Sequence, residues 1–533
     1  MKKLLICLAC VLGAVLYFFY ILWRVSSIPL NSDTANMTLE ACDILRGNVF
    51  LSGWNLTGVT FITTDMLYFL IGAAIGGVSV LSSNLAIALM YFVCVLCALL
   101  LIRIKGNKLI AFLIFAGIAL FPGIYTVDNA RVHTALYAFL FLLMYAIGRA
   151  FSDGGKKYLY AIFILTALSV CGDGISLIVM VLPVLAVCLY NITANKQSDI
   201  RKNIMISLFT CLGAAAGFIM DKLFFILGTA DKQYYFDARG FKTVEGIFTD
   251  FPIYIKAVTY MMNAHFFGRQ LLNIKTPVLC INVLLMLFGY YIVYKNISDF
   301  IRRKTDDHIS VMLSIGFAAM SVILILTDFM DEMVVGRYII YMPILFAVLI
   351  IRWIWRAGWF DKKFYSGRFS FKIILTLFAA VLIIATAIPK GAPAGEVTQA
   401  RLARFMAERN LKNGYGQFWD ASYVTVATNG ETTVRTVVGA PMGMTRLNWF
   451  SKKPWYEEYA DFVVIRAWEV IEEDQINNNV FYTRPWPYHD YDITKPKALA
   501  AFGEPADKLI FENYEIWLYD YDISTKLYKG GTR

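Results

Sequence analysis

The sequence is poor in charge: Asp, Glu, Lys and Arg make up 17% of its 533 residues, whereas 58% are hydrophobic. A soluble protein of this length could not bury so much apolar side chain. None of the nine cysteines follows Cys280, so no disulfide framework is expected in the C-terminal part. There is also no P-loop, GxSxG motif or zinc-type cluster, and no nucleotide cofactor is expected. These absences predict a membrane protein.

Eleven apolar runs are long enough to cross, or nearly cross, a hydrocarbon core about 30 Å thick. They lie near 4–23, 85–102, 109–124, 134–150, 158–171, 175–190, 204–226, 277–294, 309–327, 338–355 and 372–388. The first run has no small-residue cleavage site after it, so we interpret it as a retained helix rather than a signal peptide. With a cytoplasmic N-terminus every inner loop is basic, which predicts an extracytoplasmic C-terminus. The excess of 49 Lys and Arg over 39 Asp and Glu is thus a topology signal, and no nucleic-acid partner is expected.

A further apolar segment, 66–80, is short and rich in glycine. Counting it as a span would turn the rest of the chain over and place the basic loops outside. We therefore predict an outer-leaflet helix there, flat or re-entrant. Two predicted outer stretches, 24–84 and 227–276, are too long to be simple turns, and long connections are usually functional.

After a linker at 390–395 the composition becomes that of a soluble α/β domain. Helical spacing around 402–406 ends at Asn413-Gly414. Strands are predicted at 424–426, 432–438 and 462–465, and a hairpin at 509–511 and 514–519. The predicted fold is a polytopic α-helical membrane protein, with a transmembrane domain at 1–390 and an extracytoplasmic α/β domain at 391–533.

The first outer loop concentrates acidic residues beside the membrane. Its four carboxylates are Asp33, Glu40, Asp43 and Asp65. On a helix that begins near Ser32, the side chains of Asp33, Asn36, Glu40 and Asp43 recur at spacings of three and four and share one face. A solvated helix face would show the same spacing, so both interpretations stay open.

Three further places at the outer ends of the spans hold polar groups. Asp128, Arg131 and His133 precede the run at 134–150, where interfacial aromatic belts and snorkelling charges also gather. Asp173 lies between two glycines, a composition that a simple hairpin turn also favours. Arg337 precedes the run at 338–355, where a guanidinium can bind a lipid-borne phosphate or act as an interfacial anchor.

Charged groups crowd the outer ends of the spans and are scarce in their middles, whereas transporters usually need ionisable sites near the midplane. The arrangement resembles the GT-C superfamily of membrane glycosyltransferases, which includes protein O-mannosyltransferases and the bacterial enzyme that adds aminoarabinose to lipid A. The shared features are a first span, a long outer loop with the early acidic motif Ser32-Asp33-Thr34, juxtamembrane helices around 36–47 and 66–80, and a polar second outer loop. Residues 400–440, with the motif at 414–421, and the Phe502-Gly503-Glu504-Pro505 ending also look like the C-terminal domains of many bacterial members.

The resemblance implies transfer of a sugar from a polyprenyl-phosphate donor to a saccharide, lipid or protein acceptor at the outer face of the bilayer. It points to an acidic residue of the first outer loop as base, which is Asp33 here, and to basic residues that hold the donor phosphate. The candidate catalytic residues are Asp33, Asp43, Asp128 and His133. The candidate substrate-binding residues are Arg131, Arg337, Glu40 and Asp173. The loop 227–276 is a candidate cover for the donor groove.

The acceptor class and a requirement for a divalent metal stay open, because Thr34 stands where the mannosyltransferases have the second residue of an Asp-Glu pair. Two rival functions also remain. A flippase or transporter of lipid-linked saccharide would explain the spans and the outer charges. A non-catalytic sensor or scaffold would act through the C-terminal domain and leave the membrane loops free to vary in charge.

Overall fold

The computed structural model describes residues 2–102, 108–153, 155–194, 199–228, 231–232, 240–268, 276–327, 333–359, 397–440, 443–466 and 493–528, together with a few single positions between 373 and 383. Within these residues seven helices are long and apolar enough to cross a membrane. They are α1 (Lys2–Ser26), α4 (Val80–Leu99), α7 (Thr134–Asp153), α10 (Ile200–Gly228), α12 (Thr276–Ile301), α13 (His308–Leu326) and α14 (Met342–Arg356). Each coincides with a predicted span, which confirms the polytopic membrane architecture.

Three predicted spans correspond to shorter helices that pack between the long ones. They are α5 (Lys108–Phe115), α8 (Lys156–Gly172) and α9 (Leu182–Thr193). A π-helical turn extends α5 over Ala116–Leu120, and another precedes α9 at Leu177–Val181. The predicted span at 372–388 lies outside the continuously described residues. The count of eleven spans therefore stays a prediction.

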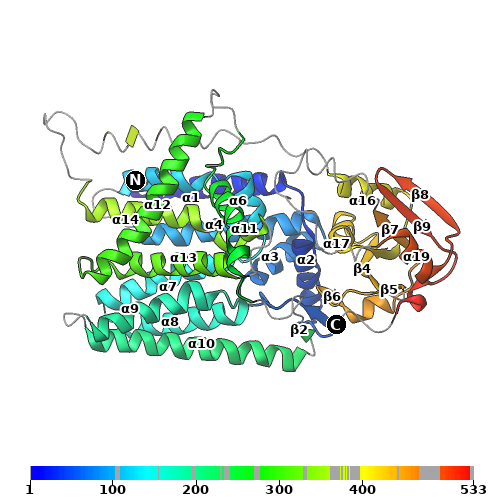
Figure 1. The fold of residues 1–533 in the computed structure, drawn as a ribbon, viewed down its shortest axis with the longest axis horizontal. Helices are drawn as coiled ribbons and strands as arrows, with labels where there is room; N and C mark the ends of the chain where they lie inside the picture. The colour runs from blue at the N-terminus through cyan, green and yellow to red at the C-terminus, as the bar shows by residue number, and fades with distance from the viewer. Residues whose placement is uncertain are drawn as a thin grey trace.

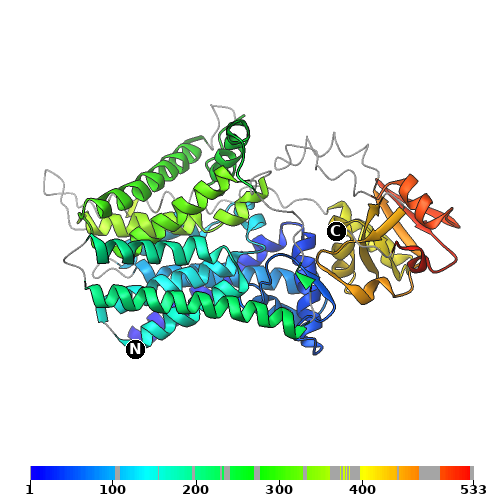
Figure 2. The same cartoon turned by 60° about the horizontal axis from the view of Figure 1, so that its bottom comes forward.

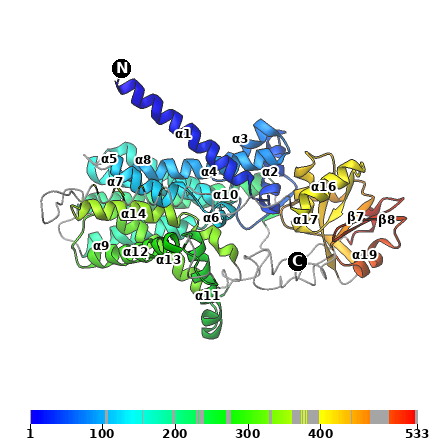
Figure 3. The ribbon, with the colours of Figure 1, turned by 90° about the horizontal axis from the view of Figure 1, so that it is seen from above.

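The bundle has a buried centre and an apolar outer surface. Most of the span that contains α14 is buried, and its Phe346 packs edge-on against Phe317 of α13. By contrast, α1 is largely uncovered and leans away from the other helices (Figure 3). Leu4 and Leu8 of α1 are among many large apolar side chains exposed on the outer helices. Such surface suits contact with acyl chains.

Shorter elements gather at one end of the bundle, which we call the sheet-facing end (Figure 1). They are α2 (Ser32–Leu45), α3 (Met66–Gly76), α6 (Ile124–Asn129), α11 (Val244–Met261) and the 3-10 helix η4 (Met333–Ile339). The predicted helix at Ser32 is confirmed. So is a short helix in 66–80, whose 11 residues rise only about 16 Å and cannot cross a bilayer.

The C-terminal region is a six-stranded mixed sheet with helices packed on it. Its strands follow the order β5-β4-β3-β7-β9-β8, and β3 runs parallel to both β4 and β7. The strands are β3 (Asn413–Gly416), β4 (Thr433–Ala440), β5 (Gly443–Arg446), β7 (Phe462–Arg466), β8 (Asp507–Phe511) and β9 (Tyr514–Leu518). The helices are α16 (Thr398–Glu408), α17 (Phe418–Ala427) and α19 (Lys495–Phe502).

The predicted strands at 432–438 and 462–465 and the hairpin are confirmed, but the strand at 424–426 is wrong. Those residues belong to α17. They are buried between the sheet on one side and the bundle on the other, so their unbroken apolar run resembles a buried strand. Asn413-Gly414 does not end the first helix either, since α16 stops at Glu408 and these residues begin β3.

A small second sheet joins three distant parts of the chain. Strand β1 (Trp54–Leu56) pairs with β2 (Asp231–Lys232) and with β6 (Ser451–Lys452). The first long loop, the second long loop and the C-terminal region therefore meet at the sheet-facing end, and Figure 2 shows the first loop between the bundle and the large sheet. The predicted domain boundary near residue 390 lies outside the described residues.

Candidate functional site

Asp33 and Arg337 face each other across the sheet-facing end. Asn31 caps α2 by accepting a hydrogen bond from the Thr34 amide, which places Asp33 in the first turn, where the helix dipole favours a negative charge. The Oδ2 atom of Asp33 lies 3.6 Å from Nη1 of Arg337 in η4, and both side chains are partly exposed. They form a loose ion pair that a ligand can reach.

A glycine brings Arg337 to this position. A Cβ atom at Gly336 would overlap with the hydroxyl of Tyr125 in α6, so the absence of a side chain at this position lets η4 pack closely against α6. The guanidinium of Arg337 lies 5.3 Å from the ring centroid of Tyr338, the next residue along η4.

His133 and Asp173 form a buried pair beside Tyr338. Nδ1 of His133 lies 2.6 Å from Oδ2 of Asp173, and both side chains are almost fully buried. The His133 ring packs 5.2 Å from the Tyr338 ring and 5.0 Å from the Phe61 ring, measured between centroids. His133 also has a φ of +64°, an uncommon value for a residue other than glycine. Tyr338 thus links this pair to Arg337.

Asp65 is another buried carboxylate of this end, to which the sequence analysis assigned no role. Its Oδ1 accepts a hydrogen bond of 3.1 Å from the Ala135 amide in the first turn of α7. Burial raises its pKa to about 6, although the charge of His133 and the Ala135 amide act in the opposite direction. The signal was its isolation, since Asp65 is the only acidic residue between Asp43 and Asp128.

Arg131 is held by Asp128 and by the backbone before α2. Its Nη2 lies 2.7 Å from Oδ1 of Asp128 and also donates to the Pro29 carbonyl. The Arg131 side chain is buried, whereas Asp128 is more than one third exposed. Asp128 therefore orients the arginine from the solvent side.

The electrostatics identify Asp33 as the group on which these charges converge. Burial raises its pKa above the ordinary value of 3.8, and the charges of Arg337, His133 and Arg131 oppose that rise. A carboxylate whose pKa is raised is a better proton acceptor when ionised. The site combines one accessible base with cations that could stabilise a developing negative charge.

Glu40 and Asp43 lie farther along α2 and have other surroundings. Asp43 is ten residues from Asp33, about 15 Å along the helix axis. Its carboxylate pairs with Lys452 at 3.0 Å and accepts from the Trp54 indole at 2.8 Å. Glu40 is fully buried, and burial raises its pKa well above the ordinary value. The structure does not bring either carboxylate to Arg337, and it excludes a solvated face for α2, most of which is buried.

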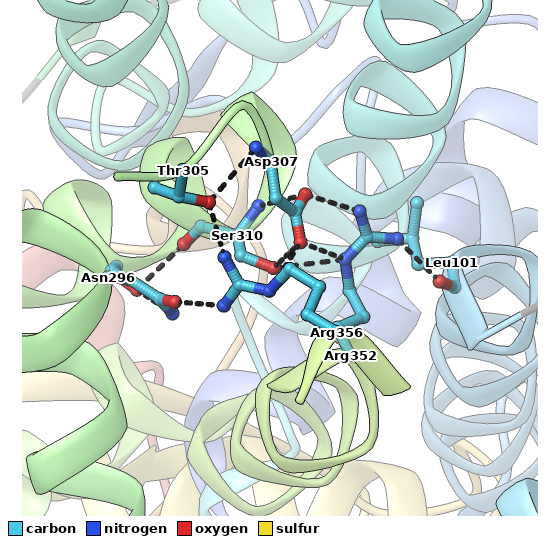
Figure 4. Close-up of polar contacts among 8 residues, drawn as sticks. Leu101, Asn296, Thr305, Asp307, Ser310, Arg352 and Arg356 are labelled. Atoms are coloured by element: carbon cyan, nitrogen blue, oxygen red, sulfur yellow. Dashed lines mark hydrogen bonds and ion pairs between the residues drawn. The ribbon is translucent and has the colours of Figure 1, made fainter. Parts of the chain in front are cut away.

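A second charged cluster lies at the end of the bundle opposite to α2, which we call the far end (Figure 1), and Figure 4 shows its contacts. Asp307 lies 2.5 Å from Nη2 of Arg352 and 3.5 Å from Nε of Arg356. Arg352 also donates to the Leu101 carbonyl at 2.9 Å, and Arg356 donates to Asn296 at 2.5 Å. These bonds tie α12, α13 and α14 to one another and to the 3-10 turn Leu100–Ile102 that follows α4, so the cluster holds this end of the bundle together.

No group of three or more His, Cys, Asp or Glu side chains is arranged to hold a metal ion among the described residues. No family model and no curated protein matches the chain. Among solved structures it is similar to ArnT from Cupriavidus metallidurans in the apo state, with a TM-score of 0.50 and 11% sequence identity. The alignment covers 90% of this chain and 97% of that one. The likeness concerns the fold, and it confirms the architecture expected from the GT-C resemblance.

Proposed function

We propose that this protein is a membrane glycosyltransferase that moves a sugar from a polyprenyl-phosphate donor to an acceptor at the outer membrane face. The observation that carries the proposal is the loose, accessible pair of Asp33 and Arg337, at one end of a bundle with an ArnT-like fold. The sheet-facing end is then extracytoplasmic, in agreement with the basic loops at the far end.

In this mechanism Asp33 accepts the proton of the acceptor hydroxyl as its oxygen forms a bond to the anomeric carbon of the sugar. The bond between that carbon and the donor phosphate breaks, and the polyprenyl phosphate leaves with the bonding electrons. Arg337 stabilises the negative charge on the leaving phosphate, and the charge of Arg131, which also acts on Asp33, adds to the positive field of the site. His133 adds to this field from the buried side, and Asp173 holds the His133 ring in place through the contact to its Nδ1 atom.

The second long loop is suited to a donor with an isoprenoid tail. Its helix α11 packs against η4, which carries Arg337. The same stretch exposes large apolar side chains, namely Phe241, Val244, Phe248, Phe251, Phe266 and Phe267. An exposed apolar surface of this kind marks an interface with lipid or with another protein. We assign it to the donor tail and the surrounding outer leaflet.

The test is transfer of label from a radiolabelled polyprenyl-phosphate sugar into a lipid or polymer fraction, using membranes with matched protein levels. The variant Asp33→Asn removes the proton acceptor but keeps the shape, so we expect a rate loss on the order of 10²–10⁴-fold. The control Asp299→Asn alters an ion pair at the far end, with Lys295, and should stay within a few-fold of wild type.

Activity of Asp33→Asn within a few-fold of wild type would remove Asp33 as the base. If the wild-type protein transfers no sugar from any polyprenyl donor but moves a lipid-linked saccharide across vesicle membranes, the enzyme proposal fails and the flippase takes its place. If it does neither, while variants of the C-terminal region alter a signalling output, the sensor is supported.

A further inference from the structure

Helix α17 of the C-terminal region lies parallel to α2, the helix that carries Asp33. Two hydrogen bonds fix their register. The Ser32 hydroxyl donates to the Phe418 carbonyl at 2.6 Å, and the Ser422 hydroxyl donates to Oδ1 of Asn36 at 2.7 Å. Both pairs are separated by 386 residues, so each helix advances by one turn between the two contacts.

The same interface continues as an apolar contact. Ala35 and Leu39 of α2 share one hydrophobic cluster with Tyr423 and Val426 of α17. Ser32 and Asn36 have no exposed surface. Water therefore cannot take the place of the Ser32 hydroxyl in one bond or of the Ser422 hydroxyl in the other. A buried acceptor that loses its donor stays unsatisfied, which makes these two bonds specific for one register.

Other contacts hold the far half of α2 against the same region. Asp43 in its last turns pairs with Lys452, and the neighbouring strand β1 pairs with β6. On its membrane side, α2 is bound through Thr38, whose hydroxyl lies 2.5 Å from that of Ser83 in α4. The helix is thus clamped between the bundle and the C-terminal region along its whole length (Figure 1).

Helix α17 is itself anchored to the large sheet. The Thr425 hydroxyl accepts from the Val434 amide at 2.9 Å and donates to the Val434 carbonyl at 3.1 Å, which ties α17 to β4. At the start of α17, Asp420 accepts from the Tyr514 hydroxyl of β9 at 3.0 Å. A displacement of α17 would require both strands to move with it.

We propose that the C-terminal region is a positioning element of the active site, in which α17 holds α2 at the height where Asp33 faces Arg337. Ser422 and Asn36 are positioning residues in this arrangement, because neither reaches the reacting atoms. The catalytic consequence rests on the proposed glycosyl transfer, whereas the docking of α17 on α2 does not. The C-terminal region is then required for turnover with any acceptor, whether or not it also takes part in selecting the acceptor.

The experiment removes one hydroxyl group from the full-length protein. In Ser422→Ala, Asn36 loses its donor, and we expect kcat to fall on the order of 10–10²-fold because small misplacements of a catalytic group are costly. KM for the donor should stay within a few-fold. Ser422→Thr keeps the hydroxyl and should restore kcat, while Asn36→Ala should lower it as Ser422→Ala does. The double variant should lose no more than either single one, since both remove the same bond.

Hydrogen exchange gives a readout that does not depend on activity. Amides of α2 should exchange faster in Ser422→Ala than in wild type, while those of α13 should not change. The matched control is Thr193→Ala, which removes an exposed hydroxyl from α9 at the far end and should change neither readout.

Unchanged exchange in α2, or faster exchange without a loss of kcat, overturns the positioning role. If Ser422→Ala is too unstable to purify, the pair Asn36→Ala and Ser422→Thr decides in the same way. If the wild-type protein transfers no sugar, the proposed function fails, and exchange in α2 still decides whether α17 holds it.

Discussion

At the far end of the bundle the carboxylate of Asp307 lies between two arginines, whereas at the sheet-facing end the carboxylate of Asp33 faces one. Burial raises the pKa of both groups, but Arg352 and Arg356 outweigh it at Asp307 and lower its pKa below the ordinary value. At Asp33 burial prevails over Arg337 and the pKa is raised. The Asp307 carboxylate is saturated with close donors and serves structure, whereas the Asp33 carboxylate, whose ion pair with Arg337 is 3.6 Å long, stays available to a substrate.

The largest effect that tests this contrast is expected at the far end. Asp307→Ala leaves two partly buried guanidinium groups without their shared partner, so we expect a loss of about 3 kcal/mol in the free energy of unfolding. Asp33→Asn breaks a looser ion pair and keeps the shape of the side chain, so we expect a smaller loss of about 1 kcal/mol or less. The measurement is reversible unfolding in mixed detergent micelles. Equal losses in the two variants would break the comparison.

The next largest effect concerns the orientation of His133. Asp173→Asn keeps the volume but removes the charged oxygen that lies 2.6 Å from the His133 imidazole. We expect kcat to fall on the order of 10²-fold, because a misplaced ring no longer contributes to the field at Asp33. Transfer assays with matched amounts of folded protein measure the loss. Full activity would exclude the buried pair from the site.

Asp65 predicts a smaller effect that depends on pH. Its pKa is about 6 in the folded state and near 3.8 when unfolded, so its contribution to stability is complete below pH 3.8 and is lost as the pH rises through 6. Between pH 5 and pH 8 wild type should lose about 1 kcal/mol that Asp65→Asn does not lose. The amide oxygen that this substitution introduces can still accept the bond from the Ala135 amide. Parallel pH profiles for both proteins would contradict the assignment.

The smallest expected effect is a displacement of the pH profile. In the proposed mechanism ionised Asp33 is the base, so we expect kcat to fall as the pH drops through its pKa, which lies above 3.8. Arg337 lowers that pKa, and Arg337→Gln should therefore move the acidic limb of kcat to higher pH. The assay follows kcat at saturating donor from pH 4 to 8. A limb that does not move would mean that another group titrates.

Local patterns in the sequence predicted most of the fold, because each pattern depends only on the residues of one continuous segment. Apolar length identified the spans, and the spacing from Asp33 to Asp43 identified α2. The strand expected at 424–426 failed because burial on two sides by distant parts of the chain removes the helical periodicity. The residues of this segment alone do not show which distant parts of the chain will cover them.

The site was predictable in part for the same reason. Asp33, Arg131, His133 and Arg337 each stand at the outer end of a span, so the topology alone predicts that they lie at one level. Their grouping depends on how the helices pack side by side. Gly336 and Tyr338 contribute to that packing, and residue spacing in the sequence does not predict it. Asp43 lies on the same predicted helix face as Asp33, so the sequence did not distinguish the two carboxylates. The difference comes from Lys452, the partner of Asp43, which is 409 residues away.

The pairing of β1 with β6 also sets an order of events during synthesis. Asn55 and Ser451 are 396 residues apart in the chain, and they meet in the small sheet. At about 5–20 residues per second, β1 waits on the order of 20–80 s after leaving the ribosome before β6 exists. During that interval α2 has already been synthesised but lacks its contacts with the C-terminal region. The end that is synthesised first is therefore completed last, and a nascent chain that stops before residue 451 carries a full set of long apolar helices with an unfinished α2.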